Sequence, residues 1–327
     1  MRVLYWLRPV SGGILHHVHE LVHSLPFEVH VGGFVPYTLA ETEIVRHPRP
    51  FRSRNALIRL SQQLKPDIIH VHGFQAALTA YLAQLPYVLT VHGFPPATLR
   101  WLALELIRSA EHVFFMSNSL QTHFPSVHGQ KLNNTVDARF SKTTRQLSDH
   151  PSLCVVSRLV PQKGIHLLIE ALPQLQRVEL HVVGDGPERR RLQRLGQTLG
   201  VAEQIYWHGH QTDVTPWLSR AWFYVQPSLQ EGQGLSLLEA MAMGIPCIAT
   251  KRGGLTETIV GRGLAIDPKV SELVTAVQKL LMDSTLAQRY AQIGHKYATN
   301  FTTEPFVTSV RTAYEQLLVD RTRCHVP

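Results

Sequence analysis

The chain has 327 residues, of which 44% are hydrophobic and 17% charged. This composition excludes an intrinsically disordered protein, and the length suffices for two domains of about 150 residues, each with its own core. The formal net charge is +8, and residues 1–149 hold 14 Lys and Arg against 9 Asp and Glu. The excess favours anionic ligands, but no dense basic run carries interleaved aromatic residues, so we predict no nucleic-acid partner.

The spacing of the cysteines and the length of the apolar runs indicate the cellular compartment. Cys154, Cys247 and Cys324 lie far apart and show no paired spacing, which predicts neither a disulfide framework nor a cysteine metal site. The apolar run at the N-terminus is too short for a signal peptide, and no apolar stretch approaches the roughly 18 residues of a membrane helix. We therefore expect a cytoplasmic protein.

The first half of the chain alternates strand-like and helix-like patterns. Residues 1–7 predict a strand, and residues 14–25 predict a helix that ends before Pro26. Further strands are expected at 28–33, 67–72, 87–92 and 112–117, with helices around 56–64, 76–85 and 98–109. This alternation implies a parallel sheet that binds ligands at the carboxyl ends of its strands.

Gly12 and Gly13 separate the first strand from its helix, which is where backbone amides can approach a phosphate. Many α/β turns need a glycine for geometry alone, so the pair is a weak signal. A Rossmann oxidoreductase would need G-x-G-x-x-G here, and the sequence does not contain it.

The first helix also contains a zinc-hydrolase pattern, H-E-x-x-H, at residues 19–23. On a helical wheel His16, His19 and His23 share a face roughly opposite the apolar stripe. The helix breaks soon after, and only Glu41 or Glu43 could supply a nearby third ligand. We therefore favour a solvent-facing histidine stripe and keep zinc hydrolysis as an alternative.

Charged residues in the second half suggest an anion site. Arg158 lies at the end of the strand expected at 153–159, and Lys163 precedes the helix expected at 165–172. The two cations can converge on one anion, Arg as a planar fork and Lys as a point charge. The alternative is that both are solvated surface residues. Gly184 and Gly186 form another glycine turn after a strand. These glycines either let a ligand approach the backbone or serve backbone geometry alone.

Two carboxylates flank a glycine-rich loop and the start of a helix near residue 234. Glu231 lies in the loop and Glu239 at least a turn inside the helix, so both can reach one crevice. The amides of Gly234, Leu235 and Ser236 form an anion site at the helix start. A ligand here would place its phosphates on the amides and its hydroxyl groups on the two carboxylates. A sugar nucleotide has both kinds of group. The alternative is a plain turn with solvated charges.

Residues 231–239 resemble the Glu-x7-Glu motif of retaining glycosyltransferases of family 4, which have the GT-B fold. That fold has two Rossmann-like α/β domains facing across a cleft, and a last helix that crosses back to the first domain. The resemblance implies that Glu231 contacts the transferred sugar and that Glu239 holds the ribose. Gln233 departs from the pattern, because an aromatic residue is more usual there.

Other positions match the family in the expected order. Arg158 and Lys163 resemble its diphosphate clamp, and His92 matches its active-site histidine, which would contact the transferred sugar. Gly12 and Gly13 resemble the loop beneath the donor diphosphate, and Gly184 the loop near the nucleobase. His70 and His72 are expected to have no catalytic duty.

The resemblance also implies domain limits: residues 1–145 for the acceptor side, 152–303 for the nucleotide-sugar side and 304–327 for the returning helix and tail. Residues 141–151 are polar and aperiodic and are expected to be the linker.

The expected reaction is retaining, metal-independent transfer of a hexosyl-type group from a nucleotide diphosphate sugar to a glycan, lipid-linked or small-molecule acceptor. No Asp-x-Asp sequence is present to chelate a metal diphosphate, so we expect no metal and no cofactor. A nucleotide-sugar epimerase and a noncatalytic binding subunit are the alternatives of similar fold. Five arginines, Arg46, Arg49, Arg52, Arg54 and Arg59, suggest either peripheral contact with an anionic membrane or an ordinary solvated face.

Overall fold

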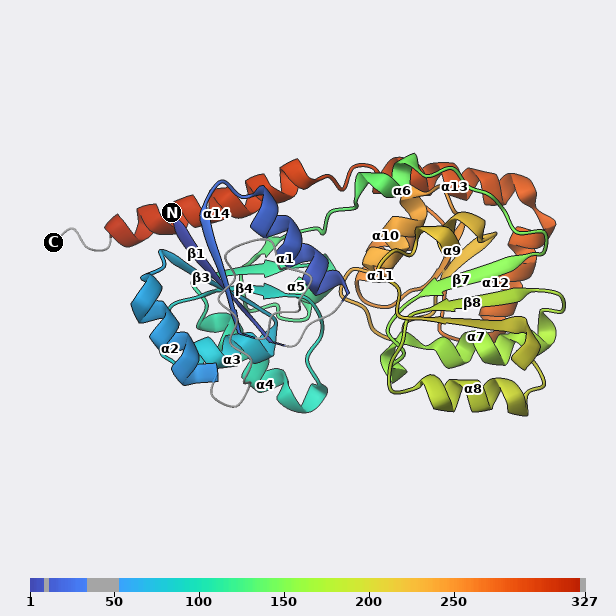
Figure 1. Ribbon diagram of the computed structural model, residues 1–327, viewed down its shortest axis with the longest axis horizontal. Helices are drawn as coiled ribbons and strands as arrows, with labels where there is room; N and C mark the ends of the chain where they lie inside the picture. Colours follow the sequence, from blue (N-terminus) through green and yellow to red (C-terminus); the bar gives the residue numbers. More distant parts are fainter. Residues whose placement is uncertain (9–11, 34–52, 324–327) are drawn as a thin grey trace. The chain divides into compact units, whose positions relative to one another are not determined.

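The computed structural model describes residues 1–8, 12–33 and 53–323. They divide into two compact units, Met1–Thr135 with Thr303–Pro327 and Val136–Thr302. Each unit is a parallel six-stranded sheet with helices on both faces (Figure 1). This is the pair of Rossmann-like α/β domains that the sequence predicts.

The first sheet has the strand order β2-β1-β3-β4-β5-β6. Its strands are β1 (Arg2–Leu7), β2 (Glu28–Gly33), β3 (Ile68–His72), β4 (Val88–Val91), β5 (His112–Phe115) and β6 (Gln130–Lys131). Successive side chains point to opposite faces. Leu4 and Trp6 therefore pack with α2 (Ser53–Leu64), α3 (Phe74–Leu82) and α4 (Arg100–Arg108), whereas Val3 and Tyr5 pack with α1 (Gly13–Ser24) and α14 (Thr303–Arg323).

The second sheet has the strand order β12-β11-β10-β7-β8-β9. Its strands are β7 (Ser152–Val156), β8 (Glu179–Val183), β9 (Ile205–Gly209), β10 (Phe223–Gln226), β11 (Cys247–Thr250) and β12 (Leu264–Ile266). One face carries α7 (Ile165–Ala171), α8 (Arg189–Thr198) and α12 (Val270–Met282). The other carries α6 (Ala138–Lys142), α9 (Thr215–Arg220), α10 (Leu235–Ala242), α11 (Gly254–Ile259) and α13 (Ser284–Ala298). Buried Cys154 and Cys247 pack in this second core.

The last helix, α14, belongs to the first unit, as the resemblance implies (Figure 1). The Tyr314 hydroxyl lies 3.2 Å from the Tyr5 hydroxyl inside the core. Near the end of α14, Arg321 Nε donates a 3.0 Å hydrogen bond to Glu111 Oε1. Residues 303–323 therefore pack on the unit that contains β1.

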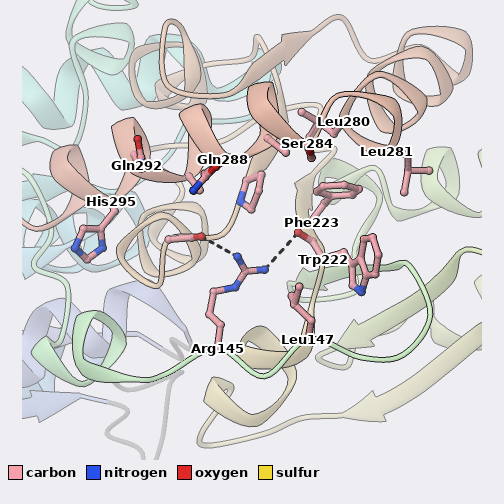
Figure 2. Close-up of a pocket in the computed structure, with 14 residues that line it drawn as sticks. Arg145, Leu147, Trp222, Phe223, Leu280, Leu281, Ser284, Gln288, Gln292 and His295 are labelled. Carbon is pink, nitrogen blue, oxygen red and sulfur yellow. Dashed lines mark hydrogen bonds between the residues drawn. The ribbon is translucent and has the colours of Figure 1, made fainter.

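The segment expected to be the linker packs against the second unit instead. The boundary between units falls after Thr135, ten residues before the predicted limit at 145. Phe140 is buried in the core of the second unit. The Arg145 guanidinium donates to the carbonyl oxygens of Gly244 at 3.0 Å and Trp222 at 3.4 Å (Figure 2). It also donates to the Ala221 carbonyl at 2.6 Å. A polar, aperiodic sequence can be ordered in this way when one long side chain binds main-chain carbonyls.

Several residues named from the sequence lie outside the described part of the chain. They are Arg46, Arg49, Arg52, Glu41, Glu43 and Cys324. The other two arginines of the predicted basic group, Arg54 and Arg59, are exposed on α2.

A substitution at Gly184 tests the close approach of two backbone segments in the second unit. Its φ is +133°, and a Cβ there would lie 1.9 Å from the Ser157 carbonyl oxygen. We expect Gly184→Ala to lower the free energy of unfolding by more than about 3 kcal/mol, because the clash with rigid backbone adds to the strain of the dihedral. Gly200→Ala is the control: its φ is also positive at +68°, but nothing lies within 4 Å of its Cβ position. It should cost only about 1 kcal/mol in the same denaturant titration. Equal losses in the two variants would contradict the close approach.

Candidate functional site

A chain of hydrogen bonds runs from β10 into the loop before α10. The Tyr224 hydroxyl donates to Gln226 Oε1, and Gln226 Nε2 donates to Ser228 Oγ at 2.9 Å. Ser228 Oγ then donates to Glu231 Oε2 at 3.2 Å. Because Tyr224, Gln226 and Ser228 are buried, their polar atoms have to be paired inside the protein. The strand therefore fixes the position of the Glu231 carboxylate.

Lys163 supplies the charge that faces Glu231. Its Nζ forms an ion pair with Glu231 Oε2, and the two side chains are 23% and 15% exposed. Lys163 ends a 3-10 turn, Pro161–Lys163, and Gly164 follows with φ +65°. A Cβ at Gly164 would lie 2.1 Å from the Pro227 carbonyl oxygen, so only glycine lets the turn approach the end of β10 this closely. The structure thus brings together Lys163 and Glu231, 68 residues apart in sequence.

Arg158 differs from Lys163 in its surroundings. It follows β7 at the same edge of the sheet, and its side chain is exposed. The backbone there is fixed, because Leu159 N donates to the Asp185 carbonyl at 2.9 Å. Arg158 and Lys163 therefore both lie beyond the carboxyl end of β7, one exposed and one paired with a carboxylate.

The amino terminus of α10 lies beside this pair. Gly234 precedes the helix with φ +86°, and the first internal hydrogen bond runs from Leu237 N to the Gly234 carbonyl at 3.1 Å. The amides of Gly234, Leu235 and Ser236 thus precede the regular helix pattern. The positive φ of Gly234 favours a glycine whether or not a ligand is bound, and a Cβ there would also lie 2.4 Å from Leu255 Cδ2.

Glu239 lies further along α10 in a different environment. Burial raises the pKa of its carboxyl group from 4.5 to about 7, and the positive charge of Arg139 opposes the shift. A carboxylate desolvated in this way gains strongly from any hydroxyl donor that a ligand brings. It is therefore chemically suited to hold a diol such as a ribose.

The glycines of the other two predicted ligand loops differ from each other. Gly12 precedes α1 with φ +63°, and nothing lies within 4 Å of its Cβ position. Gly13 is the first residue of α1. Gly184, by contrast, lies against the Ser157 carbonyl, so backbone packing accounts for this glycine.

His92 is part of a histidine cluster at the carboxyl edge of the first sheet. Its Nε2 lies 3.1 Å from His72 Nδ1, and its ring packs edge-on against His17 with centroids 4.8 Å apart. His17 lies on the buried face of α1 and is bonded through Nδ1 to Asn134 Oδ1 at 2.9 Å. Burial lowers the pKa of His17 to about 4 and holds those of His72 and His92 well below the usual range. All three imidazoles are thus neutral at pH 7.

The sequence interpretation assigned no role to His70 and His72 and missed His17. His72 contacts His92 directly, and His70 stacks on His72 with centroids 4.4 Å apart. His70 itself is bonded to the Tyr314 hydroxyl at 2.5 Å and to Thr90 Oγ1 at 2.7 Å. Histidines that end neighbouring strands were the available signal, because parallel strands place such residues side by side.

The H-E-x-x-H segment does not form a zinc hydrolase site in the described part of the chain. The Glu20 carboxylate accepts a 2.8 Å hydrogen bond from Thr303 Oγ1, and His23 Nδ1 is bonded to the His19 carbonyl. His19 and His23 are exposed and stack on each other, as expected for a solvent-facing pair. His16 was wrongly assigned to this stripe: its Nε2 lies 3.0 Å from Thr135 Oγ1 in a half-buried position.

Comparison with known proteins decides the family. The protein-family model described as "Glycosyltransferase Family 4" matches residues 11–134, and the family model described as "Glycosyl transferases group 1" matches residues 150–283. The chain belongs to glycosyltransferase family 4. HepE from Anabaena, solved with UDP and glucose, has a TM-score of 0.84 at 20% identity over 97% of this chain and all of that one, which shows a shared fold.

Two curated relatives of the family match the chain over shorter stretches. The lipopolysaccharide core biosynthesis glycosyltransferase LpsE of Rhizobium meliloti is 32% identical over 53% of this chain. A GDP-mannose-dependent phosphatidylinositol monomannoside mannosyltransferase of Mycolicibacterium smegmatis is 34% identical over 57% of it. The matched stretches span about half of each relative, 51% and 53%.

The second unit has a cavity of about 500 Å³ at the amino ends of its strands, opposite the edge that carries Lys163 and Glu231 (Figure 2). Phe223, the first residue of β10, lines it together with Arg145, Leu280 and Gln288. Open parallel α/β sheets bind ligands at the carboxyl ends of their strands, so this cavity is not the candidate donor site. Within the described residues, none of the helices is both long and apolar enough to cross a membrane.

The pKa of Glu239 predicts a pH dependence of stability. The folded state binds a proton more tightly here than the unfolded chain does, so this group lowers stability as pH rises from about 4.5 through about 7. Glu239→Gln removes the ionisable group. We expect the variant to gain roughly 2 to 3 kcal/mol over the wild type at pH 8 and little at pH 4.5, measured by urea unfolding. Glu203→Gln, at an exposed carboxylate, is the control. A Glu239 variant with the wild-type pH profile would refute the raised pKa of the Glu239 carboxyl group.

Proposed function

We propose that the protein transfers a hexosyl group from a nucleotide diphosphate sugar to an acceptor, with retention at the anomeric carbon and without a metal ion. The observation that carries this proposal is the partly buried ion pair between Lys163 and Glu231 beside the start of α10. It places a cation, a carboxylate and helix amides together at the carboxyl ends of the strands. A diphosphate needs the cation and the amides, whereas the hydroxyl groups of a sugar need the carboxylate.

The ion pair suggests how the donor is bound. In the free protein Glu231 neutralises Lys163. A bound diphosphate offers Lys163 a stronger partner, because its oxygens carry more charge than one carboxylate. Lys163 then binds the diphosphate together with Arg158 and the amides of residues 234–236. Glu231 becomes free to accept hydrogen bonds from the hydroxyl groups of the sugar, and Glu239 accepts those of the ribose.

Departure of the nucleoside diphosphate is the difficult step. Negative charge develops on the leaving phosphate as the bond to the anomeric carbon breaks, and fixed cations and amides stabilise that charge most in a partly desolvated site. The proton of the acceptor hydroxyl passes to the leaving phosphate on the same face of the sugar. His92, held neutral by burial, is suited to contact the sugar without adding a positive charge.

The assigned donor site is tested by nucleotide affinity. We expect Lys163→Ala and Glu239→Ala each to weaken binding of the preferred nucleotide diphosphate by about tenfold or more, because each removes a charged partner from a partly desolvated site. The measurement is calorimetry, after thermal-shift screening of UDP- and GDP-sugars to find the base. Lys251→Ala is the matched control, since Lys251 pairs with Asp267 at 3.5 Å in the same unit.

Unchanged affinity in both site variants would rule out the assignment. An epimerase is separated by adding acceptors: a transferase releases nucleotide in proportion to acceptor, whereas an epimerase converts the donor alone.

For the acceptor, we propose a lipid-linked glycoside at an anionic membrane surface. The named relatives act in lipopolysaccharide core synthesis and on a phosphatidylinositol mannoside. In this chain Trp101 and Leu99 are 69% and 46% exposed next to Arg100, at the start of α4. Exposed aromatic and aliphatic side chains beside a cation are typical of surfaces that enter a lipid interface.

Sedimentation with vesicles tests this acceptor proposal. We expect the wild type to bind anionic vesicles more than neutral ones at low salt. Trp101→Gln with Leu99→Gln should reduce binding severalfold, because apolar insertion is lost. Arg54→Gln with Arg59→Gln tests the charge contribution from α2. Met282→Gln is the control, because Met282 is 84% exposed in the other unit. If the wild type ignores anionic vesicles, the acceptor is to be sought among soluble glycans or small metabolites.

A further inference from the structure

Three histidines meet at the carboxyl edge of the first sheet. His17 comes from the buried face of α1, His72 ends β3, and His92 follows β4. One ring nitrogen from each lies within 4.8 Å of the other two. All three belong to the first unit, so the cluster does not depend on the second.

His17 is oriented as metal-ligating histidines are. Its Nδ1 donates to the amide oxygen of Asn134 at 2.9 Å, which places the lone pair on Nε2. That Nε2 is buried and has no hydrogen-bond partner among the described residues. Imidazoles that bind metals usually donate their other N–H to an oxygen in this way, which fixes both tautomer and ring orientation. An unpaired buried lone pair is costly unless something occupies it.

His72 and His92 complete the geometry. Their facing nitrogens, Nδ1 and Nε2, are 3.1 Å apart. Two nitrogen ligands of a tetrahedral ion with bonds of 2.0–2.1 Å lie about 3.3 Å from each other, so the observed separation suits two ligands of one ion once the rings turn their lone pairs toward it. His70 stacks on His72, and both nitrogens of His70 are already bonded, so it supports the site without joining it.

We propose that His17, His72 and His92 bind a divalent transition-metal ion such as Zn²⁺, with the fourth position open to water or an anion. The ligands are neutral imidazoles, which suit zinc, copper and nickel, whereas magnesium and calcium prefer oxygen ligands. Among the described residues the cluster contains no carboxylate. Selectivity for a soft or borderline ion therefore follows from the ligand set.

Metal binding has a consequence for the reaction, and this part rests on the proposed function. His92 is assigned to contact the transferred sugar. An ion bound to its Nε2 makes that nitrogen unavailable to the sugar. The ion is thus an inhibitor of transfer, not a requirement for it. Activity should survive EDTA and fall as zinc is added.

Zinc binding is measured first by calorimetry on metal-free full-length protein, without any sugar substrate. The parent protein carries His19→Ala and His23→Ala, because the exposed stacked pair on α1 can also chelate zinc. We expect the parent to keep one tight zinc site. His17→Leu in this background should weaken that site at least tenfold, and His72→Gln is a second variant in case Leu at position 17 impairs folding. His181→Gln, from a histidine pair 3.0 Å apart in the other unit, is the control and should retain the site.

X-ray absorption on the zinc-loaded parent should report three imidazole nitrogens at about 2.0–2.1 Å. The proposal is overturned if the His19→Ala, His23→Ala protein binds no zinc, or if folded His17→Leu and His72→Gln variants bind it as tightly as their parent. The inhibitory part has its own test: loss of transfer in EDTA with recovery in zinc would make the ion essential and contradict it. Because binding is measured without substrate, failure of the transferase assignment leaves the metal result readable.

Discussion

The ion pair between Lys163 and Glu231 is the interaction on which the candidate donor site depends. Two charged side chains in a partly buried place are stable only when their remaining polar atoms are bonded. Ser228 supplies that bond to Glu231, and the buried run from Tyr224 through Gln226 holds Ser228. Thr250 Oγ1 adds a bond from β11 to the Ser228 carbonyl at 2.5 Å. Two adjacent strands of the sheet thus hold the carboxylate.

The same constraint explains why glycines surround the pair. The turn after Lys163 has to approach the end of β10, so Gly164 leaves no room for a side chain. The loop after Glu231 reaches α10 through Gly234, whose φ of +86° favours a glycine. These glycines shape the protein before any ligand arrives. A ligand then meets a prearranged set of charges and amides, which lowers the cost of ordering the site on binding.

Much of the fold was predictable from the sequence, because strand and helix periodicities alternate clearly in both halves. The predicted strands at 28–33 and 67–72 agree with β2 and β3 to within one residue. The segment predicted to be the linker lies with the second unit, and nothing in the sequence indicates that Arg145 binds carbonyls far along the chain. The spatial pairing of Lys163 with Glu231 follows from parallel strand order. The Glu-x7-Glu resemblance marked Glu231, and the diphosphate-clamp resemblance marked Lys163.

The sequence offered a signal for only part of the histidine cluster: His72 and His92 lie at the ends of two expected strands, but nothing marked His17. His17, His72 and His92 are far apart along the chain, and each alone is a plausible core or loop residue. Only the order of β3 and β4 in the sheet and the buried face of α1 bring them together. Tyr224, Gln226 and Ser228 were missed for a related reason: polar residues at the end of an apolar strand showed their role only when their bonds to Glu231 were seen.

The most direct test of the account is the anomeric configuration of the sugar released when water replaces the acceptor. The purified protein is incubated with the α-linked nucleotide sugar that stabilises it best, and the product is followed by proton NMR before it mutarotates. The account predicts the α-anomer as the first product, at a rate that falls sharply in Lys163→Ala. A first-formed β-anomer, or an epimerised nucleotide sugar with no free sugar, would contradict it.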